Sequence, residues 1–322
     1  MTAAGFVPPT VVLDLDRTLI YSRAAAGAVS QDALRCVEVY RDNPQSFMTV
    51  PAMGLLERLT TRATVVPCTT RTVEQYRRVR LPLPMPRYAV AANGGTLLCD
   101  GEPDAQWHRR VRDRLRRDSA PLSEVAALFS ADAGSAWMHA TRLADDLFCY
   151  AVVDVAALPD DRLPRWRDAV AARGWNLSRQ GRKVYLMPDG LTKMNAVDEI
   201  LDRIGGSRER LFAAGDGALD IPVLAAAAGA IRPRHGELEE LGWSAPSVAV
   251  TDSDGASAAE ELLTWLTQQV ETDSVGNNGT DSVGDIETDS VGDIETDSVG
   301  DTMDVSAHHD HPGAHAGERH YT

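Results

Sequence analysis

The sequence predicts an α/β protein with a doubly wound parallel-sheet core, an inserted α+β cap domain and a disordered acidic tail. Buried strand-like segments alternate with helix-period segments, which is typical of a parallel sheet covered on both faces. The stretch 98–185 breaks this alternation with shorter strands and helices. Beyond residue 270 the chain becomes a short repeat with few large apolar groups.

The core is expected to comprise residues 8–97 and 186–270. Its strands are apolar runs that end in polar clusters, and its helices have apolar residues at helical spacing. In parallel sheets of this kind, ligands bind at the carboxyl ends of the strands, so the polar clusters mark the expected site. The expected strands are Val11–Asp16, Ala63–Pro67 and Leu211–Ala214; the expected helices are Met53–Thr60, Val73–Arg80, Met194–Ile204 and Ile221–Ala228.

The expected cap, residues 98–185, has α+β composition and is long enough to form a separate inserted domain. Its expected elements, in order, are two helices, two strands, a helix and two strands: Ala105–Arg117, Leu122–Phe129, Ser135–Ala140, Leu147–Val153, Asp160–Arg173, Trp175–Arg179 and Lys183–Leu186.

The tail, residues 271–322, repeats Glu-Thr-Asp-Ser-Val-Gly-Asp-Ile with a period of eight and ends in a His-rich segment. Each copy offers too little apolar surface to offset the entropy of ordering, so we expect disorder. The histidines either bind Zn²⁺ or Ni²⁺ weakly or are simply solvated. They are His308, His309, His311, His315 and His320.

Charge is distributed unevenly along the chain. The 322 residues carry a formal charge of −15, but the tail holds 13 acids against one arginine, whereas residues 1–270 hold 34 acids against 31 bases. The core and cap are therefore nearly neutral and lack the basic field that would bind nucleic acid or an anionic membrane.

The sequence also favours a cytoplasmic location. No apolar run approaches the ~18–20 residues that span a bilayer, and the start of the chain lacks the basic and apolar regions of a secretion signal. The four cysteines are scattered with no Cys-x-x-Cys pair, which suits a reducing compartment.

The polar clusters at the strand ends have the residue types that phosphoryl transfer requires. Asp14 and Asp16 end the first strand, so one carboxylate can attack phosphorus while the other, protonated, meets the leaving oxygen. Two anions facing a phosphate repel it unless a cation intervenes, and Asp216 supplies another hard oxygen for Mg²⁺. Thr69 can donate a hydrogen bond to the phosphoryl group, and Lys193 can neutralise negative charge.

Each of these residues, taken alone, is more simply explained by a structural role than by catalysis. An Asp-x-Asp at a strand end is usually a turn or a helix cap, Thr69 is usually a local backbone partner, and a lone lysine is usually solvated. Three strand ends and one helix start that each supply the required residue type make coincidence a poor explanation of the set.

The segment VVLDLDRTL, with Asp14, Asp16 and Thr18, resembles the first signature of the haloacid dehalogenase (HAD) superfamily of phosphohydrolases. Thr69 and Lys193 correspond to its second and third signatures, and Gly215–Asp220 to its fourth. Asn93-Gly94-Gly95 and the large insertion resemble the Cof-like branch and its sugar-phosphate phosphatase relatives.

The resemblance implies a role for each matching residue. Asp14 is the implied nucleophile, which forms an aspartyl-phosphate, and Asp16 is the general acid and then base. Thr69 and Lys193 stabilise the phosphate. The implied Mg²⁺ ligands are Asp14, the main-chain carbonyl of Asp16 and Asp216, with Asp220 supporting. The candidate substrate-binding residues at these signatures are Thr18, Thr70, Arg71, Asn93 and Gly94. Arg71 is either a second phosphate contact or an exposed arginine that opens a helix.

This sequence departs from the family pattern at three positions, none of which removes a reacting group. Arg17 replaces a frequent glycine and either points to solvent or adds a charge beside the phosphate. Thr70 replaces the glycine of Thr-Gly-Arg, and Leu219 replaces a frequent asparagine.

The cap must choose the substrate, because the core recognises only phosphate. Arg179-Gln180-Gly181-Arg182 looks like a turn between two strands, from which Arg179 and Arg182 can reach the site as part of a lid. Trp137 and His139 are two apart and so share one face of a strand, which is either the lid or a solvated outer face.

The sequence therefore predicts an Mg²⁺-dependent phosphatase acting on a small phosphorylated metabolite, with a sugar phosphate as the favoured substrate. A phosphomutase or phosphotransferase would use the same nucleophile, passing the phosphoryl group to a sugar hydroxyl instead of water. A non-catalytic protein that recruits a basic partner through its acidic tail is the weaker alternative.

Overall fold

The structure, a computed structural model, describes residues 7–278. The later copies of the octapeptide repeat and the His-rich end lie outside the described residues, so their predicted disorder and weak metal binding stay predictions. Within residues 7–278, no helix is both long and apolar enough to cross a membrane.

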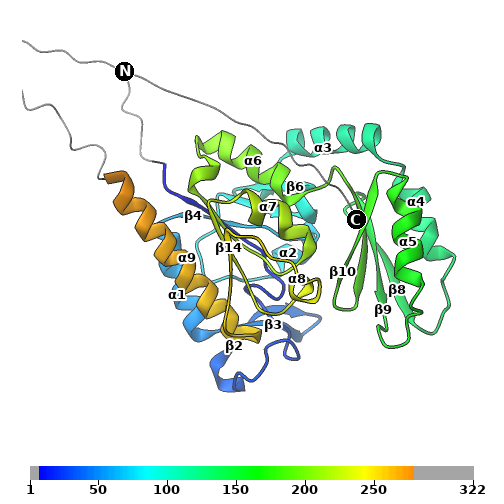
Figure 1. Ribbon diagram of the computed structural model, residues 1–322, viewed down its shortest axis with the longest axis horizontal. Helices are drawn as coiled ribbons and strands as arrows, with labels where there is room; N and C mark the ends of the chain where they lie inside the picture. Colours follow the sequence, from blue (N-terminus) through cyan, green and yellow to red (C-terminus); the bar gives the residue numbers. More distant parts are fainter. Residues whose placement is uncertain (1–6, 279–322) are drawn as a thin grey trace, which may run out of the picture. The chain divides into compact units, whose positions relative to one another are not determined.

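A parallel sheet forms the centre of the described chain, with the strand order β14-β13-β12-β1-β4 (Figure 1). Val12 of the first strand lies opposite Ala213 on one side and Val66 on the other. The strands are β1 (Thr10–Leu13), β4 (Thr64–Pro67), β12 (Leu211–Ala214), β13 (Gly229–Arg232) and β14 (Val248–Val250).

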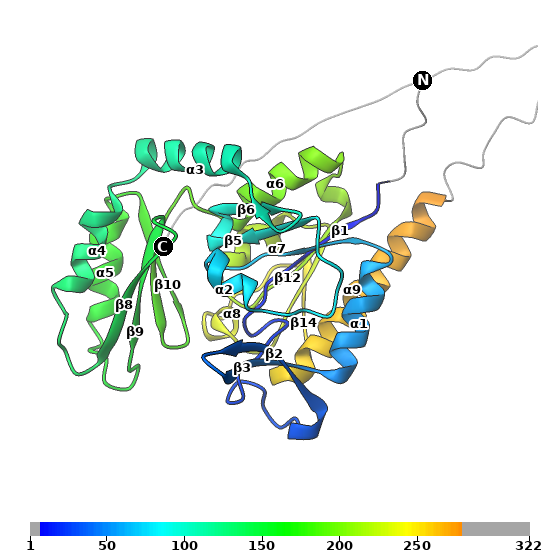
Figure 2. The ribbon, with the colours of Figure 1, turned by 180° about the vertical axis from the view of Figure 1, so that it is seen from behind.

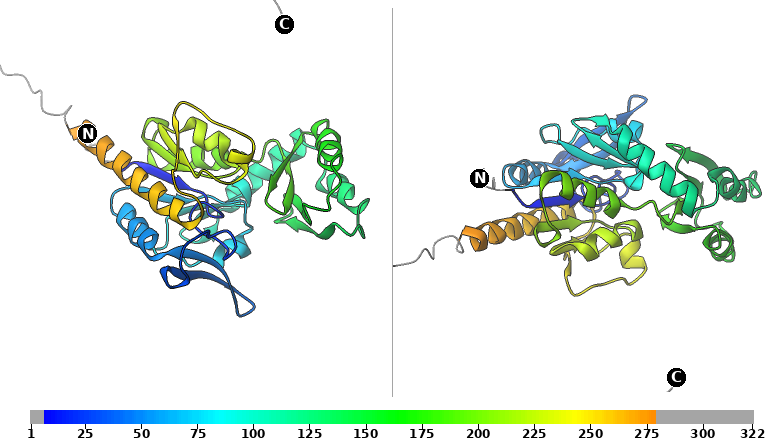
Figure 3. Two further views of the ribbon diagram at one scale, coloured as in Figure 1. Left: turned by 60° about the horizontal axis from the view of Figure 1, so that its bottom comes forward. Right: turned by 90° about the horizontal axis from the view of Figure 1, so that it is seen from above.

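Helices cover both faces of this sheet, so the doubly wound arrangement is confirmed. Alternate strand residues point to opposite faces: Val11 packs in one buried cluster with helices α1 and α9, and Val12 packs in another with α6 and α7. Figure 3 shows these helices on the two sides of the sheet. The helices are α1 (Val50–Thr60), α6 (Lys193–Ile204), α7 (Ile221–Ala226) and α9 (Gly255–Asn278).

A β-hairpin between β1 and α1 was not predicted. It consists of β2 (Leu34–Tyr40) and β3 (Asn43–Thr49), joined by a two-residue turn. Arg41 and Asp42 both have positive φ, the conformation of a type I′ turn, which usually contains glycine or asparagine. The turn therefore carries no recognisable hairpin signal in the sequence.

Short elements link the central sheet to the insertion. They are α2 (Val73–Arg77) and an antiparallel sheet of β5 (Tyr88–Ala91), β6 (Thr96–Cys99) and β7 (Glu102–Pro103). Helix α8 (Glu237–Glu240) follows β13.

The insertion contains a four-stranded antiparallel sheet with the order β10-β11-β9-β8 and three helices, which confirms the α+β cap (Figure 2). Its elements are α3 (Ala105–Asp118), α4 (Leu122–Ser130), β8 (Met138–Ala144), β9 (Phe148–Val153), α5 (Arg162–Ala171), β10 (Trp175–Gln180) and β11 (Lys183–Pro188). The strand expected at Ser135–Ala140 begins three residues later, because Ser135 takes part in backbone-bonded turns with Asp132 and Met138.

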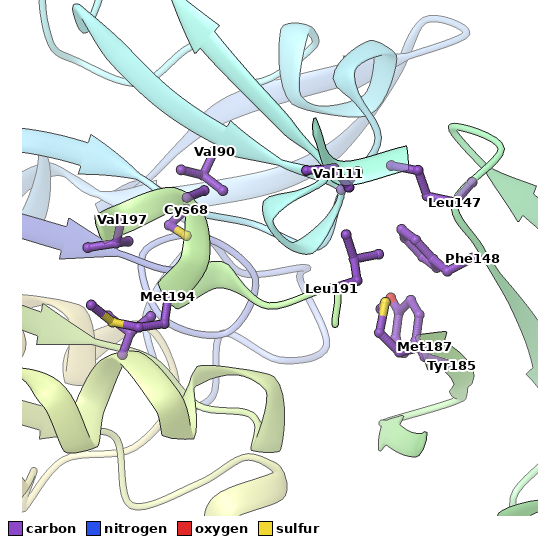
Figure 4. Close-up of a cluster of buried hydrophobic side chains, with 14 of the residues drawn as sticks. Cys68, Val90, Val111, Leu147, Phe148, Tyr185, Met187, Leu191, Met194 and Val197 are labelled. Carbon is purple, nitrogen blue, oxygen red and sulfur yellow. The ribbon is translucent and has the colours of Figure 1, made fainter. Parts of the chain in front are cut away.

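The cap and the core share one continuous buried hydrophobic cluster (Figure 4). Leu147, Phe148 and Tyr185 of the cap belong to the same cluster as Cys68 and Val197 of the core. This packing joins the cap sheet to the face of the central sheet that carries α6.

Helix α9 continues to Asn278, eight residues into the segment that was expected to be disordered. Asp273 accepts hydrogen bonds from Arg210 at 2.6 and 2.9 Å, and Glu271 pairs with Arg62. The first repeat copy is thus tied to the core by ion pairs, which a prediction based on its low apolar content could not include.

Candidate active site

Three neighbouring strands of the central sheet end at one edge, and each end supplies a predicted site residue. Asp14 follows β1, Thr69 follows β4 and Asp216 follows β12. The main chain remains bonded past the strands, because the Asp14 N–H donates to the Ala214 carbonyl at 3.0 Å and the Thr69 N–H donates to Val90 at 2.9 Å.

A buried lysine joins two of the carboxylates at this edge. Lys193 is the first residue of α6, and its Nζ lies 2.5 Å from both Asp14 Oδ1 and Asp220 Oδ1. The second oxygen of Asp220 accepts a hydrogen bond from the Gly217 N–H at 3.0 Å. The protein therefore uses both oxygens of Asp220, whereas Asp14 and Asp216 keep oxygens available.

The carboxylates of Asp14, Asp216 and Asp220 are all buried, with oxygens within 4.8 Å of one another. Burial raises the pKa of Asp14 to about 7, despite the opposing charge of Lys193. Burial and the charges of Asp14 and Asp220 also raise the pKa of Asp216 well above its usual value. Two acidic neighbours outweigh burial and raise the pKa of Lys193, so it stays charged.

This donor set fits a divalent cation. Of the three carboxylates, Asp14 and Asp220 are at ion-pair distance from Lys193, and Asp216 Oδ2 is 3.8 Å from Arg17 Nε. Closely spaced carboxylate oxygens are the ligands that Mg²⁺ prefers, and a cation would offset both the burial and the mutual repulsion that raise the pKa values of Asp14 and Asp216. Asp14 and Asp216 are the residues best placed to hold it.

The side chain of Asp16 is not part of this cluster. Its two oxygens each accept a hydrogen bond of 2.7 Å from Arg71, in a bidentate pair. The Asp16 side chain is 42% exposed, and the charge and hydrogen bonds of Arg71 outweigh the opposing effect of burial and lower its pKa. Arg71 also pairs with the buried Glu38 on β2, at 2.9 Å.

Arg17 adopts a positive φ of 62°, a conformation that glycine adopts more readily than arginine. Its side chain turns toward Asp216 and is 34% exposed, so this departure adds a cation beside the acidic cluster. The neighbouring Thr18 is fully buried and donates a hydrogen bond of 3.3 Å to Asp14 Oδ2.

Thr69 and Thr70 are both buried beside these groups. Thr69 Oγ1 accepts a hydrogen bond from the Arg71 N–H at 3.2 Å. Its hydroxyl hydrogen is therefore available to a ligand.

Asn93 and Gly94 pack against the segment that leads into α6. Asn93 Nδ2 donates to the Leu191 carbonyl at 2.7 Å, and the Gly94 carbonyl accepts a hydrogen bond of 2.9 Å from Trp107 Nε1. Gly94 has a φ of 96°, and a Cβ there would overlap the Thr192 carbonyl. These contacts hold the residues that place Lys193, and substrate binding by Asn93 or Gly94 stays a prediction.

The turn of the β10–β11 hairpin reaches this edge of the core, as its sequence suggested. Arg182 is exposed and, with Asp16 and Asp216, lines a cavity of about 280 Å³ between core and cap. Arg179 instead donates to Glu240 of α8 at 2.6 Å. Arg179 is thus bound to the core surface, whereas Arg182 faces the cavity.

Glu237 was not predicted from the sequence, and it is a buried carboxylate that joins the cap to the core. It accepts hydrogen bonds from Ser178 Oγ at 2.9 and 3.1 Å, from the Arg179 N–H at 3.0 Å and from the Ala218 N–H at 2.9 Å. The run Gly-Glu-Leu-Glu-Glu reads as an exposed helix start. Gly236 packs so closely against Asp216 that a Cβ there would lie 2.5 Å from Asp216 Oδ2. The glycine before Glu237 was therefore the available sign in the sequence that this run packs against the site.

No protein-family model matches the chain, and no curated protein matches it in sequence. Solved structures do match. The sucrose-phosphatase of Synechocystis sp. PCC6803, in complex with sucrose and phosphate, aligns with 80% of this chain and 98% of its own, at 16% identity and a TM-score of 0.58.

Two further structures align over nearly their full length. A Thermoplasma acidophilum protein, 0175, covers 83% of this chain and 99% of its own, at 15% identity and a TM-score of 0.54. BT4131, a HAD subclass IIB sugar phosphatase, covers 81% of this chain and 99% of its own, at 11% identity and a TM-score of 0.51. The chain therefore has the fold of the HAD sugar phosphatases, with core and cap together.

Proposed function

We propose that this protein is an Mg²⁺-dependent phosphatase that hydrolyses a small phosphorylated metabolite, a sugar phosphate by preference, through an aspartyl-phosphate on Asp14. One observation carries the proposal: at the carboxyl edge of the sheet the buried Asp14 contacts Lys193 at 2.5 Å and has an oxygen within 4.8 Å of one of Asp216. The fold shared with sucrose-phosphatase and a sugar phosphatase supports the substrate class.

Asp14 has the contacts expected of a nucleophile. Lys193 holds Oδ1 at 2.5 Å, whereas Oδ2 has a single weak contact, the 3.3 Å bond from Thr18. A carboxylate fixed at one oxygen presents the other in a defined direction. An O–P bond would form at this oxygen as the P–O bond to the leaving alcohol breaks.

Asp16 would supply the proton that the leaving oxygen needs and then accept a proton from the attacking water. In the structure Arg71 holds Asp16 as an anion, so Asp16 cannot yet act as the acid. An incoming phosphate competes for Arg71, and loss of that contact raises the pKa of Asp16 toward the value that an acid requires. Glu38 keeps a partner during this exchange, since Ser46 Oγ donates to it at 2.6 Å.

Asp14 and Asp216 would hold Mg²⁺, with Asp220 supporting through its contacts to Lys193 and Gly217. Bound there, the ion would neutralise charge on the phosphate. Lys193 lowers the pKa of Asp14 and so favours its ionised, nucleophilic form.

The test is hydrolysis of p-nitrophenyl phosphate and glucose 6-phosphate by the full chain, with Mg²⁺ or with EDTA. The Asp14→Asn variant should lose activity by at least about a thousandfold while its circular dichroism spectrum is unchanged. Asp202→Asn, an exposed aspartate on α6, is the matched control. Near-normal hydrolysis by Asp14→Asn would refute the mechanism, and measuring free phosphate against transferred phosphate separates hydrolysis from phosphotransfer.

A further inference from the structure

We propose that the substrate carries a second anionic group, a carboxylate or another phosphate, and that Arg182 and Lys183 of the cap hairpin bind it. This inference rests on the proposed function, since it places the hydrolysed phosphate at Asp14. It narrows the substrate class from phosphorylated sugars in general to those with an acidic group away from the ester.

The cavity between core and cap has a reactive side and a basic side. Asp16, Arg17 and Asp216 line it from the core. The β10–β11 turn lines it from the cap with Gln180, Gly181, Arg182 and Lys183. A ligand whose phosphate reaches Asp14 through this cavity would extend its other end toward that turn.

The two cap cations lack an acidic partner of their own. In the part of the chain that the structure describes, neither Arg182 nor Lys183 has a carboxylate at ion-pair distance. The nearby Arg179, which belongs to the same hairpin, is paired with Glu240 at 2.6 Å. In this hairpin Arg179, which lies against the core surface, thus has an acidic partner. Among the described residues, Arg182 and Lys183, which line the cavity, have none at ion-pair distance.

The carboxylates of the cavity have other partners. Asp16 is held by Arg71 in the bidentate pair, and Asp216 belongs to the cluster that fits a divalent cation. The hydrolysed phosphate would be served by Lys193, Thr69 and that cation. Arg182 and Lys183 are therefore in excess of what one phosphate requires.

Lys183 is a partly buried ammonium group. Its Nζ lies 5.8 Å from the centre of the Tyr150 ring, and the neighbouring Tyr185 and then Asp16 raise its pKa. A cation that stays charged in a confined site is stabilised by a counter-charge, and a neutral sugar hydroxyl would provide none.

The experiment compares three esters with the full chain and Mg²⁺. Glucose 6-phosphate has no second anion, 6-phosphogluconate adds a carboxylate and glucose 1,6-bisphosphate adds a phosphate. We expect kcat/KM at least about tenfold higher for one of the last two, which is the effect of one charge-assisted hydrogen bond. Whichever is preferred identifies the second group.

The Arg182→Gln/Lys183→Gln double variant should abolish this preference. Arg142→Gln, an exposed arginine on β8 outside the cavity lining, should retain it. Equal kcat/KM for the three esters with the wild type, or a preference that survives in the double variant, would overturn the inference.

A binding measurement separates this inference from the proposed function. Calorimetry with the Asp14→Asn variant and Mg²⁺ should show at least about tenfold tighter binding of 6-phosphogluconate or glucose 1,6-bisphosphate than of glucose 6-phosphate. The added double substitution should remove that difference. Absence of hydrolysis by the wild type would sink the proposed function alone, whereas equal affinities would sink the second-anion site even if hydrolysis occurs.

Discussion

Replacement of Lys193 by methionine tests how the acidic cluster is held together. Methionine has a similar length and no charge, so the substitution removes the cation and leaves the packing nearly intact. Lys193 is 2% exposed and contacts Asp14 and Asp220 at 2.5 Å each. The variant would leave three buried carboxylates with one cation at ion-pair distance among residues 7–278, Arg17 at 3.8 Å from Asp216.

Removal of one partner from a buried ion pair usually costs about 3–5 kcal/mol of folding free energy. We expect a loss in this range at pH 8 in EDTA. The loss should be smaller at pH 5, because without Lys193 the folded-state pKa of Asp14 rises further above about 7. The folded variant then binds more protons than the unfolded chain over a wider range of pH than the wild type does. Its free energy of unfolding therefore falls more than that of the wild type as pH rises.

Urea denaturation followed by circular dichroism measures these free energies. Lys183→Met is the matched control, since Lys183 has no carboxylate at ion-pair distance among residues 7–278, and we expect a change below about 1 kcal/mol. Saturating Mg²⁺ should return about 2–3 kcal/mol to the Lys193→Met variant at a hundred times the dissociation constant. A loss at pH 8 no larger than that of Lys183→Met would refute this account of the cluster.

Three further predictions concern individual contacts. Because the pKa of Asp14 is raised to about 7 in the folded protein, the metal-free wild type should lose stability relative to Asp14→Asn as pH rises from about 4 to 7. The loss should be at most on the order of 4 kcal/mol of unfolding free energy. If urea denaturation gives the same stability difference between the two proteins at pH 5 and at pH 8, this prediction is wrong. Glu237→Ala leaves buried hydrogen-bond donors of the cap and the core without a partner, so we expect about 3 kcal/mol of destabilisation and a higher KM. Glu240→Ala, which removes an exposed ion pair, should cost about 1 kcal/mol or less. Equal effects of the two substitutions would exclude a role of Glu237 in joining the cap to the core. Gly94→Ala places a Cβ on the Thr192 carbonyl and should lower both thermal stability and kcat. Gly134 has a similar positive φ but open space around it, so Gly134→Ala should have a smaller effect. Equal melting temperatures of the two variants would show that backbone strain at positive φ, and not the overlap with Thr192, determines the cost.

The sequence was sufficient for the parts of the fold that rest on local patterns. Apolar runs followed by Asp14 and Asp216 predicted both the sheet and the edge at which these two carboxylates meet, because strand ends in a parallel sheet converge whatever lies between them. The β2–β3 hairpin escaped prediction because its turn, Arg41-Asp42, contains no glycine or asparagine.

Two acidic residues show a second limit of sequence reasoning. Glu38 and Glu237 look like surface glutamates, yet each is buried by partners that are distant in the chain. Arg71, 33 residues beyond Glu38, and Ser178, 59 residues before Glu237, have no sequence pattern that connects them to these acids. Pairings of this kind follow from tertiary packing and were therefore not accessible.

In the proposed mechanism, the contacts of Arg71 would link substrate binding to the protonation of Asp16. Arg71 bridges two carboxylates, one of them the half-exposed Asp16 and the other the buried Glu38. The exposed partner is the easier one to exchange, because water and a phosphate can replace Arg71 there, whereas Glu38 is surrounded by protein. The hairpin that carries Glu38 thus fixes one end of Arg71 and leaves the other end free to move from Asp16 to a phosphate. Asp16 would gain its proton only when a phosphate is present to use it, so the proposed acid, whose pKa is lowered, and the proposed nucleophile, whose pKa is raised, would both reach the protonation state that the reaction needs.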